Sequence, residues 1–131
     1  MNLSSTTCDA LARCVDYPRA DLSEHAGATA ARLRRDIDDS VALTAMIDAL
    51  ASLEKWSRSV GVAAAQERYT QLFDLKPVAT LNVSHHILGD TYQRGALLAG
   101  LAAELNKAGI PHGHDLPDFL PTLLRLVGRM T

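Results

Sequence analysis

Apolar residues recur along most of this 131-residue chain at spacings of three and four, the period of an amphipathic helix. The clearest stripes are Leu43, Met46, Leu50 and Leu53 in one segment, and Leu98, Leu101, Leu105 and Ala108 in another. Val, Ile and Thr never alternate with polar residues over the length of a strand. The pattern therefore predicts an all-α fold.

Helix start and stop signals divide the chain into short elements. The predicted helices span residues 5–16, 21–37, 40–60, 62–73, 80–88, 90–108 and 118–127. Pro18 ends the first of them, Gly61 separates the third from the fourth, Lys76-Pro77 forms a turn, and Gly109 ends the longest. Asp118 is predicted to be the N-cap of the last helix, with Pro121 in its first turn. We expect residues 1–131 to form a single bundle of about six helices.

Composition excludes several classes of protein. Apolar residues make up 47% of the chain and charged residues 21%, which argues against disorder. A net charge of −2 removes the simplest case for nucleic-acid binding. No apolar run reaches the ~20 residues of a membrane span, and the N-terminus lacks the basic start and apolar core of a secretory signal. Cys8 and Cys14 point apart on a helix, so no disulfide and a cytoplasmic location are expected.

One charged pair is placed among leucines. Arg94 precedes Leu98 by four residues and Leu101 by seven, so it shares their helix face. A charge on an apolar face must be paired, and Asp90 lies four residues before Arg94, the spacing of a helical ion pair. The alternative is that Asp90 only caps the helix and that Arg94 extends to water along its aliphatic stem.

Small and polar residues beside this pair suggest a binding groove. Gly89 and Gly95 offer room for the close approach of a backbone or a ligand, and His86 lies nearby. Asp74 follows Tyr69 at a helix C-terminus, where a carboxylate is unfavourable for the helix dipole. It either caps the following turn or lines a groove for a basic partner.

Other chemistry has weaker support. A metal site is one alternative, built from His86, His112 and His114, although no Cys-x-x-Cys or His-Glu-x-x-His pattern is present. No nucleophile has a recognisable base beside it, and there is no Gly-rich phosphate loop, so an enzyme is not expected. A third alternative is a dimerisation domain that uses the amphipathic last helix.

Four motifs in order carry a resemblance to a known family. They are Tyr17-Pro18, Tyr69-x-x-Leu72-Phe73-Asp74, His86-x-x-Gly89-Asp90-x-x-x-Arg94-Gly95 and Leu116-Pro117-Asp118-x-Leu120-Pro121. With them the chain resembles the delta-subunit family of respiratory nitrate reductases, the molybdenum cofactor assembly chaperones. The resemblance covers nearly the whole chain.

The resemblance implies an all-α chaperone without enzymatic activity or a cofactor of its own. It binds the catalytic subunit of a nitrate reductase or related molybdoenzyme in the cytoplasm, usually through that subunit's N-terminal peptide, and keeps it competent for cofactor insertion. The residues expected to line or shape the peptide groove are His86, Asp90, Arg94, Asp118, Pro121, Tyr69 and Asp74. Leu116, Pro117 and Leu120 would hold the adjacent loop.

The chain departs from the family in its length. Family members usually continue with further helices after the last motif, whereas this chain ends ten residues after Pro121. We therefore expect a compact variant of the fold, a fragment of it, or a chain that takes helices from a second copy.

Overall fold

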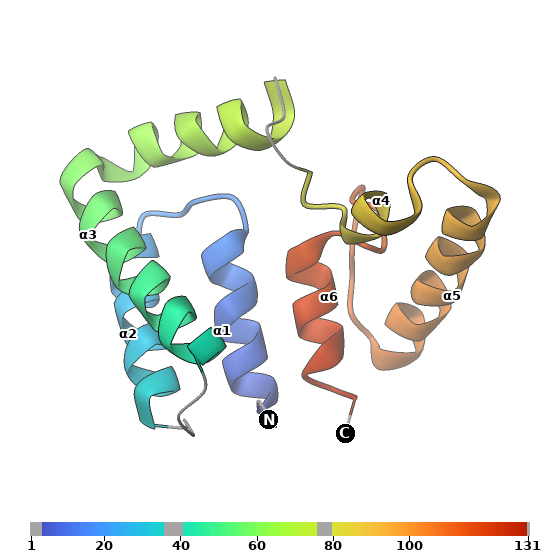
Figure 1. Ribbon diagram of the computed structural model, residues 1–131, viewed down its shortest axis with the longest axis horizontal. Helices are drawn as coiled ribbons and strands as arrows, with labels where there is room; N and C mark the ends of the chain where they lie inside the picture. Colours follow the sequence, from blue (N-terminus) through green and yellow to red (C-terminus); the bar gives the residue numbers. More distant parts are fainter. Residues whose placement is uncertain (1–3, 36–40, 76–79, 131) are drawn as a thin grey trace.

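The computed structural model describes residues 4–35, 41–75 and 80–130, and within them it is helical (Figure 1). The elements are α1 (Ser5–Val15), α2 (Leu22–Arg35), α3 (Val41–Thr70), the π-helical turn η1 (Gln71–Leu75), α4 (Val83–Leu88), α5 (Tyr92–Ala108) and α6 (Leu120–Val127). The described ranges contain six α helices and no strand, so the expected all-α fold is confirmed.

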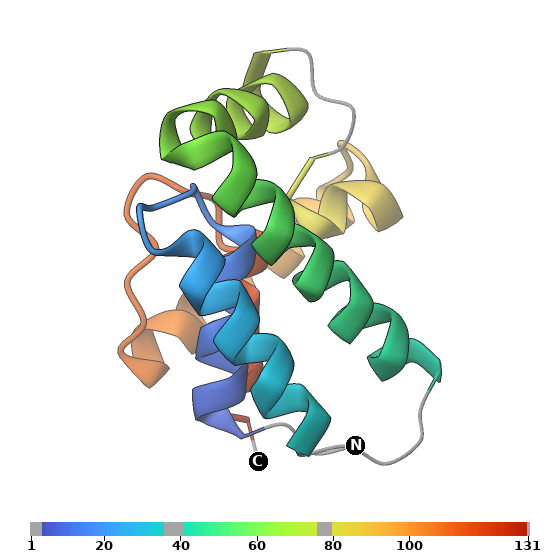
Figure 2. The same ribbon diagram turned by 90° about the vertical axis from the view of Figure 1, so that its left-hand side faces the viewer.

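The main core lies between α1, α2 and the first half of α3, which pack side by side in both views (Figures 1 and 2). Its buried members are Leu11, Cys14, Ala26, Ala30, Leu33, Leu43, Ile47 and Leu50. Both cysteines are buried, and neither forms a disulfide. The C-terminal end of α6 packs closely on α1: a Cβ atom built on Gly128 would lie only 2.8 Å from the Cβ of Cys8.

The long helix α3 changes direction at Gly61, which has φ +83° and ψ 168°. Residues with a side chain rarely adopt this conformation, so the helix break predicted at this glycine is confirmed. After the kink, α3 runs across the top of the molecule in Figure 1. There, Gln66 Nε2 donates a hydrogen bond of 2.8 Å to the Pro18 carbonyl. The α-helix ends at Thr70 and continues as η1, rather than running to Phe73 as predicted.

A smaller second core joins α5 to α6 through Leu105, Ile110 and Leu126. The helix α5 ends at Gly109, which has φ +71° as its predicted C-terminal role requires. None of the helices in the described ranges is both long and apolar enough to cross a membrane.

The predicted cap of the last helix is wrong. Phe119, not Asp118, is the N-cap of α6, while Pro121 lies in the first turn as expected. The Asp118 side chain instead accepts hydrogen bonds from residues of α4 and α5, as described below. The predicted end of a helix at 37, the start of the next at 40 and the turn at Lys76-Pro77 all lie outside the described residues.

Candidate functional site

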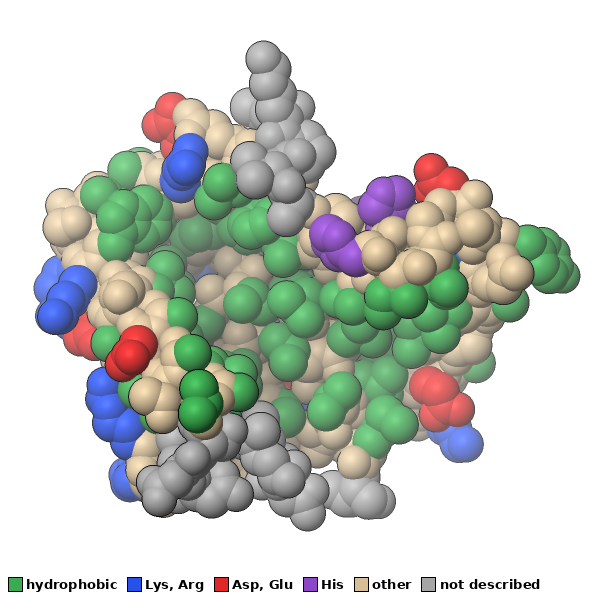
Figure 3. All heavy atoms as spheres, viewed as in Figure 1, with side chains coloured by type: hydrophobic (Ala, Val, Ile, Leu, Met, Phe, Trp, Pro, Cys, Tyr) green, Lys and Arg blue, Asp and Glu red, His purple; other side chains and the backbone are tan. Residues whose placement is uncertain are grey.

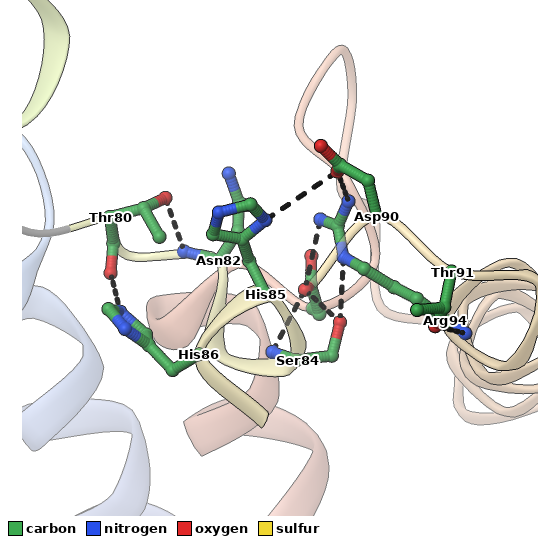
Figure 4. Close-up of polar contacts among 9 residues, drawn as sticks. Thr80, Asn82, Ser84, His85, His86, Asp90, Thr91 and Arg94 are labelled. Carbon is green, nitrogen blue, oxygen red and sulfur yellow. Dashed lines mark hydrogen bonds and ion pairs between the residues drawn. The ribbon is translucent and has the colours of Figure 1, made fainter. Parts of the chain in front are cut away.

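A buried polar cluster joins α4, α5 and the start of α6, and we call Ser84, Arg94 and Asp118 the buried node. Asp118 is completely buried, and its Oδ2 accepts hydrogen bonds from both the amide and the hydroxyl of Ser84. Arg94 donates through Nε to Ser84 Oγ at 3.1 Å and through Nη2 to Asp118 Oδ2 at 3.4 Å. Figure 4 shows Arg94 reaching from α5 towards Ser84 on α4. The Arg94 charge is therefore neutralised inside the protein.

The predicted ion pair with Asp90, which lies before the N-cap of α5 and not within a helix that starts at residue 90, is the weaker of the two that Arg94 forms. Arg94 Nη1 lies 3.8 Å from Asp90 Oδ1, so the predicted partners do meet. The Asp90 side chain is 87% exposed, however, whereas that of Asp118 is 0% exposed. Water screens the outer pair strongly, so Asp118 is the carboxylate that compensates for the burial of Arg94.

One oxygen of the node has no partner. Asp118 Oδ1 is buried and accepts no hydrogen bond within the described part of the chain. Such a group costs free energy unless it is satisfied. All the hydrogen bonds of this carboxylate therefore run through Oδ2 to α4 and α5.

No described residue approaches Gly89 or Gly95 closely, so the predicted close approach of another backbone is not seen there. A Cβ atom built at either position would have no neighbour within 4 Å. Gly89 instead ends α4 with φ +59°, so its role is conformational. Gly95 is exposed on α5, where no other described element approaches it.

An apolar groove lies on the other side of α6 from α5, between α6, α1 and α3. It consists of two hollows, with volumes of about 210 Å³ and about 380 Å³, which share Cys14, Val15 and Leu53 and so adjoin. The first is lined by Cys14, Val15, Asp16, Pro18, Leu22, Leu53, Trp56, Ala65, Arg68, Tyr69, Leu72, Phe73 and Leu81. The second is lined by Leu11, Cys14, Val15, Met46, Ala49, Leu50, Leu53, Leu120 and Leu124. Figure 3 shows hydrophobic side chains over this middle region, between α3 and α6.

The groove exists because the apolar stripe of α3 is wider than the core that α1 and α2 bury. Leu43 and Leu50 are buried, whereas Met46 is 37% exposed and Trp56 is 39% exposed. The kink at Gly61 then brings the second half of α3 over the end of the groove. Exposed apolar surface of this extent, in a concave shape, is typical of a binding site for an apolar partner.

Aromatic and acidic side chains meet at one end of the groove. Tyr69 packs edge-on against Tyr17, with 5.4 Å between ring centroids, and against Phe73 at 4.9 Å. Burial of its hydroxyl, with smaller effects from the Asp16, Asp74 and other nearby carboxylates, raises the pKa of Tyr69 to about 12. Of the predicted site residues, Tyr69 therefore lines the groove, and the exposed Asp74 lies close to it.

The node is coupled to the groove through the backbone. The amide of Leu120 donates to the carbonyl of Leu81 at 2.8 Å, and that of Val83 donates to the carbonyl of Asp118 at 3.0 Å. Leu81 lines one hollow and Leu120 the other. The buried node thus holds together the two segments that supply this wall of the groove.

The remaining predicted residues lie around this wall. Pro121 is buried in the first turn of α6. His86 is exposed on α4, and its Nε2 hydrogen-bonds to the carbonyl of Thr80 at 2.8 Å (Figure 4). Of the predicted residues, Arg94, Asp118 and Pro121 therefore lie in the interior behind this wall, and His86 and Asp90 are exposed beside it.

The metal alternative gains no support from the geometry. Across the described ranges, no three His, Cys, Asp or Glu side chains come together as a cluster that could hold a metal ion. His112 Nδ1 instead hydrogen-bonds to the carbonyl of Asp115 at 3.0 Å.

Two curated relatives match this chain, although no family model does. They are the nitrate reductase molybdenum cofactor assembly chaperones NarJ of Escherichia coli strain K12 and of Escherichia coli O157:H7. Each is 26% identical over 125 residues, which cover 92% of this chain and 50% of the relative. The chain is similar to these assembly chaperones. The resemblance indicated by the motifs is confirmed, and the chain spans half the length of the relatives.

Proposed function

We propose that this chain is an assembly chaperone for a nitrate reductase or a related molybdoenzyme and is not itself an enzyme. It binds the catalytic subunit through that subunit's N-terminal peptide and keeps it competent for insertion of the molybdenum cofactor. It acts in the cytoplasm and needs no cofactor of its own. The apolar groove is the observation that carries this proposal, and the similarity to NarJ supports it.

The groove suits the apolar face of an amphipathic helix. Such peptides dock side chains spaced by three, four and seven residues into a hydrophobic channel between helices. Met46, Leu53 and Trp56 lie along one helix and line the two adjoining hollows. Their period matches that of a helix laid alongside α3, and burying them supplies most of the affinity.

The acidic end of the groove gives the peptide a direction. Asp74 is exposed near Tyr69 and favours a Lys or Arg of the peptide at that end, whereas Asp16 is already paired with Arg125 at 3.4 Å. Among the predicted residues, Tyr69 and Asp74 therefore contact the peptide. His86 and Asp90 lie at the edge of the wall, where they contact the flanking part of the catalytic subunit.

The buried residues of the predicted set act by positioning. Arg94 and Asp118 hold α4 against the start of α6, and Pro121 sets the first turn of that helix. Their substitution moves the wall formed by Leu81 and Leu120. We therefore expect these variants to lose stability and peptide affinity together.

Titration calorimetry with a synthetic N-terminal peptide of a nitrate reductase catalytic subunit tests the proposal. We expect a dissociation constant in the micromolar range or lower. Met46→Glu should weaken binding at least about tenfold, because it places a charge in the groove. Val41→Glu is the matched control, since Val41 is 86% exposed on the same helix and lines neither hollow of the groove. Absence of heat with wild-type protein would contradict the proposal, as would equal affinities of the two variants.

A second variant tests the edge of the wall. Asp90→Ala should weaken peptide binding more than it weakens folding, because Asp90 is 87% exposed and contributes little to the folded state. Equal fractional losses in binding and in stability would reduce Asp90 to a structural role.

A further inference from the structure

The apolar groove has very few charged residues in its walls. Of the described residues that line its two hollows, two are charged, Asp16 and Arg68, and both line the smaller hollow of about 210 Å³. A charge beside an apolar surface needs a partner once a ligand covers that surface, because burial removes the water that solvates the charge. These two residues therefore carry the charges that a bound peptide must accommodate.

The charge of Asp16 is already compensated within the protein. Its Oδ2 lies 3.4 Å from Nη2 of Arg125 on α6. Its Oδ1 accepts a hydrogen bond of 2.8 Å from the amide of Tyr17. Both carboxylate oxygens are in use, so Asp16 has little capacity to bind a cation of the peptide.

The charge of Arg68 has no such compensation. Among the described residues, its guanidinium makes one polar contact, from Nη1 to Oε1 of Gln71 at 3.5 Å. That oxygen is neutral, and the distance is long for a hydrogen bond from nitrogen. No carboxylate in the described ranges forms an ion pair with Arg68. The guanidinium therefore has a positive charge and several N–H donors available to a ligand.

Arg68 lies on the side of α3 that faces the groove. Ala65 precedes it by three residues and Leu72 follows it by four, and both line the smaller hollow with it. Residues at these spacings share one side of a helical segment. The kink at Gly61 brings this half of α3 over the end of the groove (Figure 1). A peptide helix in the groove therefore passes the guanidinium with the polar residues that border its apolar face.

We propose that Arg68 selects the peptide by charge, and that it binds an Asp or Glu side chain next to the apolar residue that fills the smaller hollow. This inference rests on the proposed function and specifies the chemistry of the ligand at that site. The planar guanidinium fork matches a carboxylate and holds both of its oxygens.

The same residue discriminates against other peptides. A peptide with Lys or Gln at this point covers Arg68 and leaves its charge without a partner, which is unfavourable. Asp74 lines neither hollow, so the basic residue that it favours lies elsewhere on the peptide.

Titration calorimetry with charge-changed peptides tests this selection. The probe is the synthetic N-terminal peptide of a nitrate reductase catalytic subunit, in which the polar positions bordering the apolar face are set one at a time to Glu or to Lys. With the wild-type chain we expect a position at which the Glu peptide binds about tenfold more tightly than the Lys peptide. Arg68→Glu should reverse the preference at that position. Lys55→Glu is the matched control, since Lys55 is exposed on α3 and lines neither hollow, and it should keep the wild-type preference.

A second variant, Arg68→Met, separates the charge of Arg68 from its apolar stem. Methionine keeps an unbranched apolar side chain but has no N–H donor. We expect this variant to bind the Glu and Lys peptides with affinities within about threefold of each other. A preference for Glu that persists in Arg68→Met would show that the stem or another residue is responsible, and would overturn the proposal. Circular dichroism checks that all variants are folded.

The outcomes distinguish this inference from the proposed function. If the wild-type chain binds the Glu and Lys peptides equally well at every position, the inference is wrong, while the groove still holds the peptide. If the wild-type chain binds none of the peptides, the proposed function is wrong and the inference is wrong with it.

Discussion

Removal of the Asp118 carboxylate should lower the free energy of unfolding of this protein by a large fraction. The side chain is 0% exposed, and its partner Arg94 is 14% exposed. In Asp118→Ala the guanidinium loses the carboxylate that compensates its burial, and Ser84 loses the acceptor of its amide and hydroxyl. Breaking a buried pair in this way costs about 3–5 kcal/mol. A single domain is stable by only about 5–15 kcal/mol, so this loss is a substantial fraction of the whole.

Urea unfolding, followed by circular dichroism and by the fluorescence of Trp56, the single tryptophan, measures this loss. Asp90→Ala is the matched control, because it removes the other carboxylate of Arg94 at 3.8 Å but at an exposed site. It should change the free energy of unfolding by less than about 0.5 kcal/mol. The double variant Asp118→Ala, Arg94→Met should be less destabilised than the sum of its single variants, because no charge is left buried alone. Equal losses in Asp118→Ala and Asp90→Ala would refute the assignment of Asp118 as the compensating carboxylate.

Three further substitutions have effects that follow from local geometry. Gly61→Ala should lower stability by about 1–3 kcal/mol in urea unfolding, because φ +83° with ψ 168° strains any side-chain-bearing residue; an unchanged midpoint would mean that the kink relaxes. Gly128→Ala should cost about 1–3 kcal/mol, since its Cβ atom would lie 2.8 Å from that of Cys8, and a wild-type melting temperature would show that α6 can shift away from α1. The pKa of Tyr69 is raised from 10 to about 12 by folding, so stability should fall as the pH rises from 10 towards 12. Tyr69→Phe should flatten that part of the profile in unfolding at alkaline pH, and an identical decline in both proteins would contradict the burial of the hydroxyl.

The sequence predicts well those features that depend on neighbouring residues. The break at Gly61 and the left-handed end of α5 at Gly109 follow from the conformations that glycine alone adopts easily. These features hold in any tertiary arrangement, so no knowledge of the packing was needed to find them.

Sequence patterns do not predict features that depend on how distant residues pack together. Asp118 has the local sequence of a helix cap, but its partner Ser84 is 34 residues away and competes for the same oxygen. Met46 belongs to the same stripe as Leu43 and Leu50, and period alone does not distinguish the exposed member from those that are buried. The groove is formed by three helices and one kink, so none of its walls shows as a motif.

The most direct test of the central claim is a chemical-shift map of the full chain titrated with an N-terminal peptide of a nitrate reductase catalytic subunit. We expect the largest changes at groove residues, above all at Leu53, Leu72 and the indole of Trp56, and small changes at Tyr92, Ala99 and Ala103, which are exposed on α5 and line neither hollow. Shifts confined to these residues of α5, or no shifts at saturating peptide, would contradict the claim that the apolar groove is where this chain holds its partner.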